Sequence, residues 1–490
     1  MSVHLPILKN LLLNPRRTFV VDDKKSYSGA ELLVAALHVA AAIKAKCASK
    51  TVGVIVPTSG AFPICALAGW MTGKVVVPLN YLLKQDELQY VVDDCECDTI
   101  LTVQQMIDFM GFTPSVKNII KLEDIDFKSV PEPTWPQSAE DSDLAVLLYT
   151  SGTSGKPKGV MLSHGNLAGN VRQIRNWINI SREFVFLGVL PQFHSFGMTA
   201  LTLLPLTCCS KVVYTARFVP NKIMKLFREH RPKVFIAIPS MYNALLHAKD
   251  ATTEDWASAE YIVSGGEPLP QAVFDGFREK LGVTINEGYG LTETSPVSNW
   301  CKPNEWKPHS VGRALSELDQ RIVDPASGRT LGPNHDGEVQ MKGVNVMQGY
   351  FKLPQQTADA FTADGYFKTG DMGRIDIDGH LFITGRIKEM LIVGGENVFP
   401  REIEEVLNKH EAVKDSGVVG KMDPMRGELP VAFVELREGV DPKSFDANSL
   451  RSWCRQSLAG YKVPDEVRVM ESLPRNATGK IMRRELKKLI

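Results

Sequence analysis

Glycine and hydroxyl residues fill a short segment that follows an apolar run, and this composition suits the binding of phosphate groups. The apolar run, residues 144–150, is typical of a buried strand, and residues 150–159 read TSGTSGKPKG. Backbone N–H groups and hydroxyls in such a loop can surround phosphate oxygens, while Lys156 and Lys158 add positive charge. The segment is not a Walker A loop, because Pro157 follows Lys156 where that motif requires Ser or Thr. We expect phosphate contacts from Thr150, Ser151, Gly152, Thr153, Ser154, Gly155, Lys156 and Lys158.

Two acidic side chains lie beside glycine residues further along the chain. Glu293 follows Thr292 in NEGYGLTET, residues 286–294, and Asp371 follows a Thr-Gly pair in YFKTGDMG, residues 366–373. A carboxylate in such a place can hold a metal ion or accept hydrogen bonds. Both segments also have a purely structural interpretation, as a helix start and as a turn. The residues alone leave both interpretations open.

The elements that must position these side chains alternate between helical and β-rich patterns. Residues 27–48 are rich in Ala and Leu and predict a helix capped by Ser26 or Ser28. Short apolar runs on either side of such helices predict two α/β units with mostly parallel sheets. The expected strands are 51–56, 74–78, 100–103, 185–190, 211–214, 234–237 and 261–264.

The pattern of predicted secondary structure changes near residue 311. Short β-rich pieces punctuated by Gly, Pro and Asp predict a small antiparallel β-barrel or sheet. A final segment of about 100 residues alternates helices and strands and has the size of one domain. The predicted fold class is α/β, with a large N-terminal domain of two α/β units plus a small β-barrel, and a smaller α+β C-terminal domain. We predict domains at 1–385 and 389–490, joined by a hinge at 386–388.

Composition excludes several classes of protein. Among 490 residues, 44% are hydrophobic and 23% are charged, which are globular values. Lys+Arg and Asp+Glu both number 56, so no basic excess suggests a nucleic-acid partner. The eight cysteines follow neither a zinc-ligand nor a disulfide spacing, which favours a reduced, cytoplasmic protein. No apolar run approaches the roughly 20 residues of a transmembrane helix. Peripheral membrane contact and the oligomeric state stay open.

Five segments, in order along the chain, resemble the motifs of the adenylate-forming (acyl-activating) enzyme superfamily, of the acyl-CoA synthetase or fatty-acid CoA ligase type. They are the glycine loop at 149–159, the two acidic segments above, GRIKEMLIVGGENVFP at 385–400 and PRNATGK at 474–480. The resemblance implies an acid–thiol ligase that converts a carboxylic acid and ATP to acyl-AMP and pyrophosphate. The acyl group would then pass to CoA. The resemblance also implies Mg²⁺ on the pyrophosphate and a mobile C-terminal domain.

The resemblance implies roles for four residues at the reacting phosphate. Thr292 would hydrogen-bond the α-phosphate, and Glu293 would hold Mg²⁺ through a hard carboxylate oxygen. Lys480 would follow negative charge from the acid to the α-phosphate. His194 would lie at the mouth of the acyl pocket. A lone His is usually structural, and no acid partner suggests a hydrolase triad.

The resemblance implies a second set of residues around the nucleoside and CoA. Asp371 would accept hydrogen bonds from both ribose hydroxyls, Arg386 would also reach the ribose, and Tyr289 would stack on adenine. Lys388 would be the pivot that removes Lys480 and brings a glycine pair to the pantetheine arm. The expected nucleotide- and CoA-contacting residues are Gly265, Gly266, Glu267, Glu287, Gly288, Tyr289, Gly290, Asp371, Arg386, Lys388, Gly394 and Gly395.

The substrate is expected to be a fatty acid. Phe193 and His194, in FHSFG, stand where amino-acid-activating relatives carry an Asp, which disfavours an amino-acid substrate. An aryl-acid CoA ligase and a ligase that loads fatty acid onto an acyl carrier protein are the alternatives. A nucleotide sensor without catalysis is a further class, and the presence of Lys480, Glu293 and Asp371 argues against it.

Overall fold

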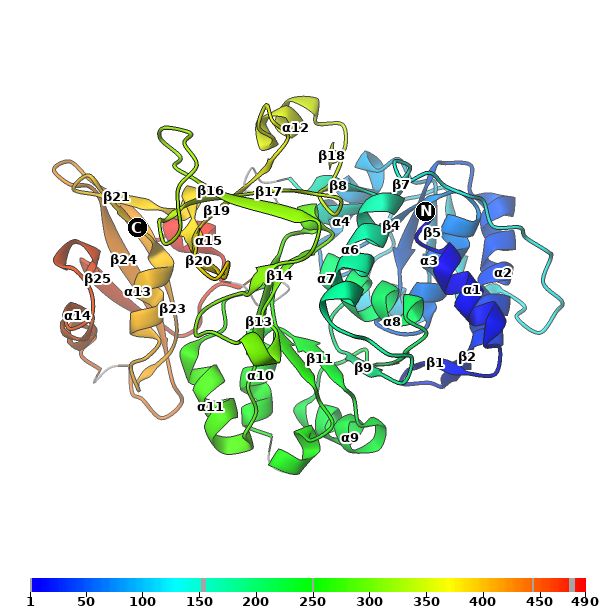
Figure 1. Ribbon diagram of the computed structural model, residues 1–490, viewed down its shortest axis with the longest axis horizontal. Helices are drawn as coiled ribbons and strands as arrows, with labels where there is room; N and C mark the ends of the chain where they lie inside the picture. The colour runs from blue at the N-terminus through cyan, green and yellow to red at the C-terminus, as the bar shows by residue number, and fades with distance from the viewer. Residues whose placement is uncertain (1, 151–155, 249–250, 443–444, 476–480) are drawn as a thin grey trace.

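The computed structural model describes residues 2–150, 156–248, 251–442, 445–475 and 481–490 of the chain (Figure 1). The expected phosphate contacts Ser151, Gly152, Thr153, Ser154 and Gly155, together with Lys480, lie outside the described residues.

The first α/β unit is built on a seven-stranded sheet. Its order is β18-β8-β7-β4-β3-β5-β6, with parallel pairing from β7 through β6 and antiparallel pairing of β7, β8 and β18. Every residue of β3, Thr51–Ile55, is buried, as expected for an apolar strand covered on both faces. The other strands are β4 Val75–Pro78, β5 Thr99–Thr102, β6 Asn118–Lys121, β7 Leu144–Thr150, β8 Lys158–Ser163 and β18 Gly349–Tyr350.

The second α/β unit is built on a nine-stranded sheet, ordered β15-β14-β13-β12-β11-β9-β10-β1-β2. Strands β13 to β1 are parallel along this order, whereas β2, β14 and β15 pair antiparallel. The strands are β1 Thr18–Val21, β2 Ser26–Ser28, β9 Val185–Gly188, β10 Lys211–Tyr214, β11 Val234–Ala237, β12 Tyr261–Ser264, β13 Asn286–Gly290, β14 Val297–Trp300 and β15 Arg313–Ala314. The two predicted α/β units are therefore confirmed, and β1 of the N-terminus joins the second unit.

The predicted small barrel is wrong in one respect, because the sheet does not close. Four antiparallel strands follow the order β16-β17-β19-β20, and within the described residues β16 and β20 form its two open edges. Closing a barrel requires strand tilt and stagger that four short strands do not supply. The strands are β16 Leu318–Val323, β17 Gly337–Gly343, β19 Phe367–Ile375 and β20 Leu381–Arg386.

The C-terminal part forms a separate α+β layer around a five-stranded sheet, at the left of Figure 1. Strands β22, β21, β24 and β23 pair antiparallel, and β25 adds parallel to β24. They are β21 Leu391–Val393, β22 Glu396–Val398, β23 Val413–Asp423, β24 Gly427–Leu436 and β25 Glu466–Met470, with helices α13 Pro400–Leu407, α14 Ala447–Arg455 and α15 Arg483–Lys487.

Helices cover the faces of the two large sheets. Helix α2 begins after Ser28, whose side chain accepts from the Glu31 backbone N–H in a capping box, so the predicted cap at Ser28 is confirmed. The helices of the N-terminal part are α1 Leu5–Leu13, α2 Gly29–Lys46, α3 Ala61–Met71, α4 Gln85–Asp94, α5 Gln104–Met110, α6 His164–Trp177, α7 Ser195–Met198, α8 Leu204–Thr207, α9 Pro220–His230, α10 Pro239–Leu246, α11 Gln271–Leu281 and α12 Pro354–Ala360.

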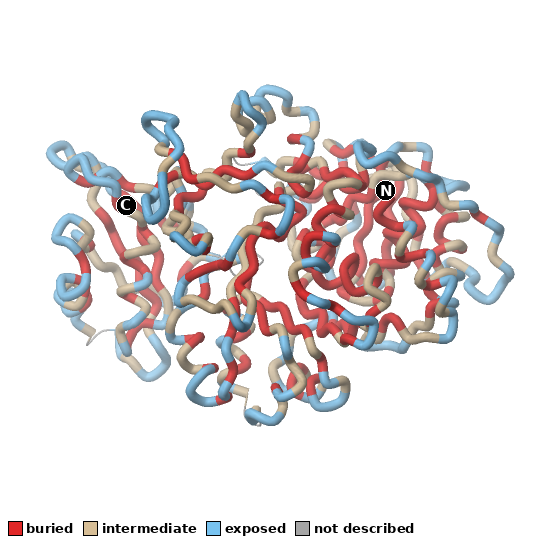
Figure 2. Tube along the Cα trace, viewed as in Figure 1, coloured by how far each residue is buried: buried red, intermediate tan, exposed pale blue. Residues whose placement is uncertain are grey.

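Buried side chains form one large core and two small ones. The large core runs through both α/β units and the four-stranded sheet as far as Leu381, and the small cores begin at Leu391 (Figure 2). The predicted hinge at 386–388 lies between Leu381 and Leu391, where the large core ends and the small cores begin. The exact domain boundaries stay a prediction. Within the described residues, no helix is long and apolar enough to cross a lipid bilayer.

Candidate active site

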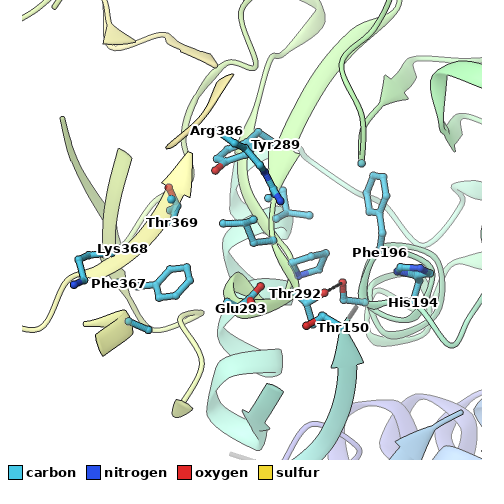
Figure 3. Close-up of a pocket in the computed structure, with 18 of the residues that line it drawn as sticks. Thr150, His194, Phe196, Tyr289, Thr292, Glu293, Phe367, Lys368, Thr369 and Arg386 are labelled. Carbon is cyan, nitrogen blue, oxygen red and sulfur yellow. Dashed lines mark hydrogen bonds between the residues drawn. The ribbon is translucent and has the colours of Figure 1, made fainter. Parts of the chain in front are cut away.

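A cavity of about 830 Å³ opens where the two α/β units, the four-stranded sheet and the predicted hinge meet. Its wall includes the end of β7, the start of α7, β13, the turn Thr292–Thr294, strand β19 and the turn Ile387–Glu389. Figure 3 shows Glu293 between His194 on one side and residues 367–369 on the other. The expected site residues that line it are Thr150, Lys158, His194, Gly266, Gly288, Tyr289, Gly290, Thr292, Glu293, Arg386 and Lys388.

Asp371 lies directly behind this wall and is held by two residues that line it. Its Oδ2 accepts a hydrogen bond from the Tyr289 hydroxyl at 2.5 Å, and its Oδ1 accepts one from Arg386 Nε at 2.7 Å. The Asp371 side chain is only 4% exposed. The Asp371 carboxylate raises the pKa of Arg386, and burial raises the pKa of Tyr289 well above its usual value. Both groups therefore donate to a fixed carboxylate.

Asp371 lies within a strand, and not in the turn that the sequence allows as its structural interpretation. Strand β19 extends through the Thr-Gly-Asp segment, because Asp371 pairs with Arg386 across β20. Gly370 adopts a φ of +70° inside this strand, a conformation that favours glycine. Asp371 is therefore a strand residue and not a turn residue.

Glu293 and Thr292 present oxygen atoms at the centre of the cavity wall. Glu293 Oε1 accepts a hydrogen bond from the Tyr350 hydroxyl at 3.0 Å, and the Thr292 and Ser195 hydroxyls lie 3.4 Å apart. Burial raises the pKa of the Glu293 carboxyl. Lys158 Nζ lies 5.2 Å from the centre of the Tyr350 ring. One tyrosine thus contacts both the expected metal ligand and an expected phosphate-binding lysine.

Glycine at position 290 is required by the turn that presents these oxygens. A Cβ atom at Gly290 would come within 1.8 Å of the Pro296 carbonyl oxygen. Any larger residue would push apart β13 and the segment before β14, and with them Thr292 and Glu293.

His194 lies on the wall of the cavity, just before α7. Its side chain is accessible from the cavity, yet the surrounding protein lowers the pKa of the imidazole below its usual value by desolvation. His194 is therefore neutral near pH 7 and adds no fixed charge to this side of the cavity.

Glu287 lies outside the cavity lining and faces the C-terminal part. Its carboxyl accepts from the Leu269 backbone N–H at 3.3 Å, and burial raises its pKa to about 7, an effect that the Arg401 charge opposes. Arg401 also donates from Nη1 to the Ile383 carbonyl at 2.8 Å, which ties α13 to β20. Glu287 thus sits at a contact between the N-terminal and C-terminal parts.

The remaining expected residues lie away from the cavity wall. Lys156 Nζ lies 5.0 Å from the centre of the Tyr90 ring on α4. Gly394 and Gly395 form the exposed turn between β21 and β22. Gly265 packs against the Phe196 ring, and neither it nor Glu267 lines the cavity.

Several lining residues were not expected from the sequence. Tyr350, Ser195 and Lys368 belong to this group. Ser195 lies in the segment FHSFG and Lys368 in YFKTGDMG, so the sequence motifs could have indicated both as site residues. Tyr350 lies in a separate strand, β18, and only its hydrogen bond to Glu293 reveals it.

Comparison with known families matches nearly the whole chain. Residues 9–351 match the family model described as AMP-binding enzyme, and residues 402–480 match the one described as AMP-binding enzyme C-terminal domain. A long-chain-fatty-acid–CoA ligase of Bacillus subtilis is 32% identical, over 96% of this chain and 91% of the relative. A 4-coumarate–CoA ligase of rice, Oryza sativa, is 33% identical over 71% of this chain and 63% of the relative.

Solved structures share the same fold. The ATP-bound structure of MatB from Rhodopseudomonas palustris superposes with a TM-score of 0.89, at 28% identity, over 100% of this chain and 99% of that one. The likeness therefore includes the C-terminal part as well as the two α/β units.

Proposed function

Because the chain belongs to the AMP-binding enzyme family and is an acid–thiol ligase that uses ATP, Mg²⁺ and CoA, we propose that the acid it activates is a fatty acid. The first half-reaction would join the acid carboxylate to the α-phosphate of ATP and release pyrophosphate. In the second, the CoA thiol would attack the acyl carbon, and AMP would leave.

The distribution of charge along the cavity wall carries this proposal. Charged lining residues come from β8, the turn at Glu293, β17, α12, β19 and the hinge segment. Another part of the wall, from α7, the helical segment Thr199–Leu203 that follows it, β11, β12 and β14, presents mainly apolar side chains. Its members are Phe196, Ala200, Ile236, Val263, Val297 and Trp300. Such a wall offers no cation for a second carboxylate and no anion for an amine, so an apolar chain fits it best.

Mg²⁺ fits the oxygen atoms on the charged side. Mg²⁺ with a nucleotide usually takes one or two protein carboxylates, substrate phosphates and water. Glu293 supplies one half-buried carboxylate, whose Oε1 accepts a hydrogen bond from Tyr350. Among the described residues there is no group of three or more His, Cys, Asp or Glu side chains that could hold a metal ion. When bound, the ion would neutralise charge on the leaving pyrophosphate.

The protein's own groups would orient the reacting atoms. Thr292 would donate to an α-phosphate oxygen, supported by the Ser195 hydroxyl beside it. Asp371 and Arg386 would hold the ribose, and Lys158 would face the outer phosphates. We place Lys480 at the α-phosphate during adenylation. Rotation about Lys388 would then remove it and bring Gly394 and Gly395 to the pantetheine arm.

A panel of acids tests the substrate class. Straight-chain fatty acids of increasing length should show kcat/KM rising about fourfold per CH₂, equivalent to ~0.8 kcal/mol, until the pocket is filled. Benzoate and cinnamate should be poorer substrates. Pyrophosphate release measures adenylation, and thioester formation with CoA measures the complete reaction.

Clear preference for cinnamate-type acids over every straight-chain acid would move the enzyme to the aryl-acid CoA ligases. The similarity to the rice relative, named a 4-coumarate–CoA ligase, supports testing that alternative. Thioester formation on an acyl carrier protein but not on CoA would favour the carrier-protein alternative.

We place the enzyme in the cytoplasm, in keeping with its eight free cysteines.

Replacing Tyr289 by phenylalanine should raise KM for ATP by about tenfold with little change in kcat. The substitution removes one hydrogen bond to the Asp371 carboxylate, and such charge-assisted bonds are worth about 1.5–3 kcal/mol. Tyr289→Leu should raise KM further, because it also removes the ring proposed to stack on adenine. ATP saturation curves of both variants provide the measurement. An unchanged KM in Tyr289→Phe would show that Arg386 alone orients Asp371.

A further inference from the structure

The apolar part of the cavity wall reaches only one layer of side chains below the ends of its parallel strands. Ile236 of β11 and Val263 of β12 pair directly, and both line the cavity. Each is the last residue but one of its strand. Because alternate residues of a strand share a face of the sheet, the next side chains on this face lie two residues further back. This second layer consists of Phe186, Val234 and Tyr261.

The second layer is packed and closes the cavity from below. None of its three residues, all of which the structure describes, lines the cavity. Phe186 and Val234 are completely buried. The Tyr261 ring meets the Trp300 ring edge to face, with ring centres 6.0 Å apart and planes at 73°. An acyl chain could pass this layer only by displacing packed side chains, which is unfavourable in a dense interior.

Trp300 closes the edge of this pocket on the side of β13 and β14. It pairs with Gly288, two residues after Asn286. Asn286 in turn pairs with Val263, so Trp300 and Val263 have their side chains on the same face of the sheet. The contact between the Trp300 and Tyr261 rings agrees with this placement. Two aromatic rings therefore form one corner of the end of the pocket.

Tyr214 of β10 closes the opposite edge, next to β9. It lies against Gly188, the partner of Ile236, and a Cβ atom at Gly188 would come within 2.6 Å of Tyr214 Cδ1. The Tyr214 hydroxyl donates to the Leu201 carbonyl at 2.9 Å and lies 2.9 Å from the Thr202 hydroxyl. Both bonds tie β10 to the helical segment that follows α7. The ring cannot swing aside without breaking them.

The depth of the pocket follows from the register of the strands. Ser264 ends β12, and Tyr261 lies three residues before it. Three residues of strand span roughly 10 Å at ~3.3 Å each. A straight acyl chain with C–C bonds of ~1.5 Å advances ~1.3 Å per carbon, so about eight carbons reach the second layer.

We propose that the second layer sets the chain length of the acid, with Tyr261 as a specificity-determining residue. The preferred substrates are straight-chain acids of about eight carbons or fewer. The proposal rests on the proposed function, because it assumes that the acid lies along the apolar wall with its carboxylate near Thr292. Each CH₂ adds buried apolar area until the chain meets the second layer, and further carbons meet packed side chains instead.

A series of acids tests the proposal in the intact, unmodified enzyme. Straight-chain acids of about 4, 6, 8, 10, 12 and 16 carbons bracket the expected limit. Each is used below the concentration at which it aggregates, and pyrophosphate release gives kcat/KM. We expect the highest kcat/KM at about eight carbons or fewer, and a value at least about tenfold lower for the twelve-carbon acid.

Tyr261→Leu removes a ring from the second layer and keeps an apolar side chain. We expect it to raise the ratio of kcat/KM for the twelve-carbon acid to that for the eight-carbon acid by about tenfold. Phe235→Leu is the matched control, because Phe235 follows Val234 in β11, faces the other side of the sheet and packs against Phe227 of α9. It should leave the ratio unchanged.

Two results would overturn the proposal while the fatty-acid ligase function stands. The first is a kcat/KM that still rises between the eight- and sixteen-carbon acids in the unmodified enzyme, which decides the matter even where a variant does not fold. The second is an equal ratio in folded Tyr261→Leu and in the unmodified enzyme. Pyrophosphate release with none of the straight-chain acids, or a clear preference for benzoate or cinnamate over all of them, would overturn the proposed substrate class and this inference together.

Discussion

Replacement of Lys480 by alanine should lower the rate of acyl-AMP formation by about 10²- to 10³-fold. The motif assigns this ammonium group to the α-phosphate, and losing one positioned charge-stabilising contact costs roughly 3–4 kcal/mol of transition-state stabilisation. Residues just after it reach the site, because Arg483 donates to Glu389, which lines the cavity, at 2.7 Å. Arg483 also binds Glu404 of α13 at 2.6 Å. The rate of pyrophosphate release provides the measurement.

Measuring the second half-reaction shows whether Lys480 acts only in adenylation or in both half-reactions. Thioester formation from supplied acyl-AMP should be much less affected in Lys480→Ala, because the proposed rotation removes Lys480 before CoA attacks. Lys487→Ala is the matched control, since it removes an exposed lysine from the same basic tail. Equal losses in both half-reactions would contradict the rotation.

Replacing Glu293 by glutamine should lower adenylation by about 10²-fold and weaken the response to Mg²⁺. The amide keeps the size of the side chain and can still accept from Tyr350, but it removes the negative charge proposed to hold the ion. Titrating Mg²⁺ at saturating ATP measures the effect, and the half-saturating Mg²⁺ concentration should rise in the variant.

Glu338→Gln is the control for this effect. Glu338 also lines the cavity, and its carboxylate accepts from Gln340, but no role is proposed for it. The control should keep the Mg²⁺ dependence of the unmodified enzyme. If Glu338→Gln shifts the Mg²⁺ titration and Glu293→Gln does not, the metal ligand has been assigned to the wrong carboxylate.

The amino-acid sequence by itself determined the two α/β units and most of the motifs that meet at the cavity. Apolar runs such as β3 and β11 are buried on both faces, so local composition alone specifies them as strands. The glycines at 290 and 370 are visible in the sequence, but the structure supplies the reason for them, a close backbone contact at Gly290 and a positive φ at Gly370.

Tertiary structure decided which side chains meet. Tyr289 and Asp371 are 82 residues apart in the chain, and Glu293 and Tyr350 are 57 apart. Their hydrogen bonds depend on how β13, β18 and β19 are placed by separate sheets, and local composition does not encode that placement. The same dependence explains why the four-stranded sheet stays open and why β1, at the N-terminus, pairs with β10 through Val20 and Val212.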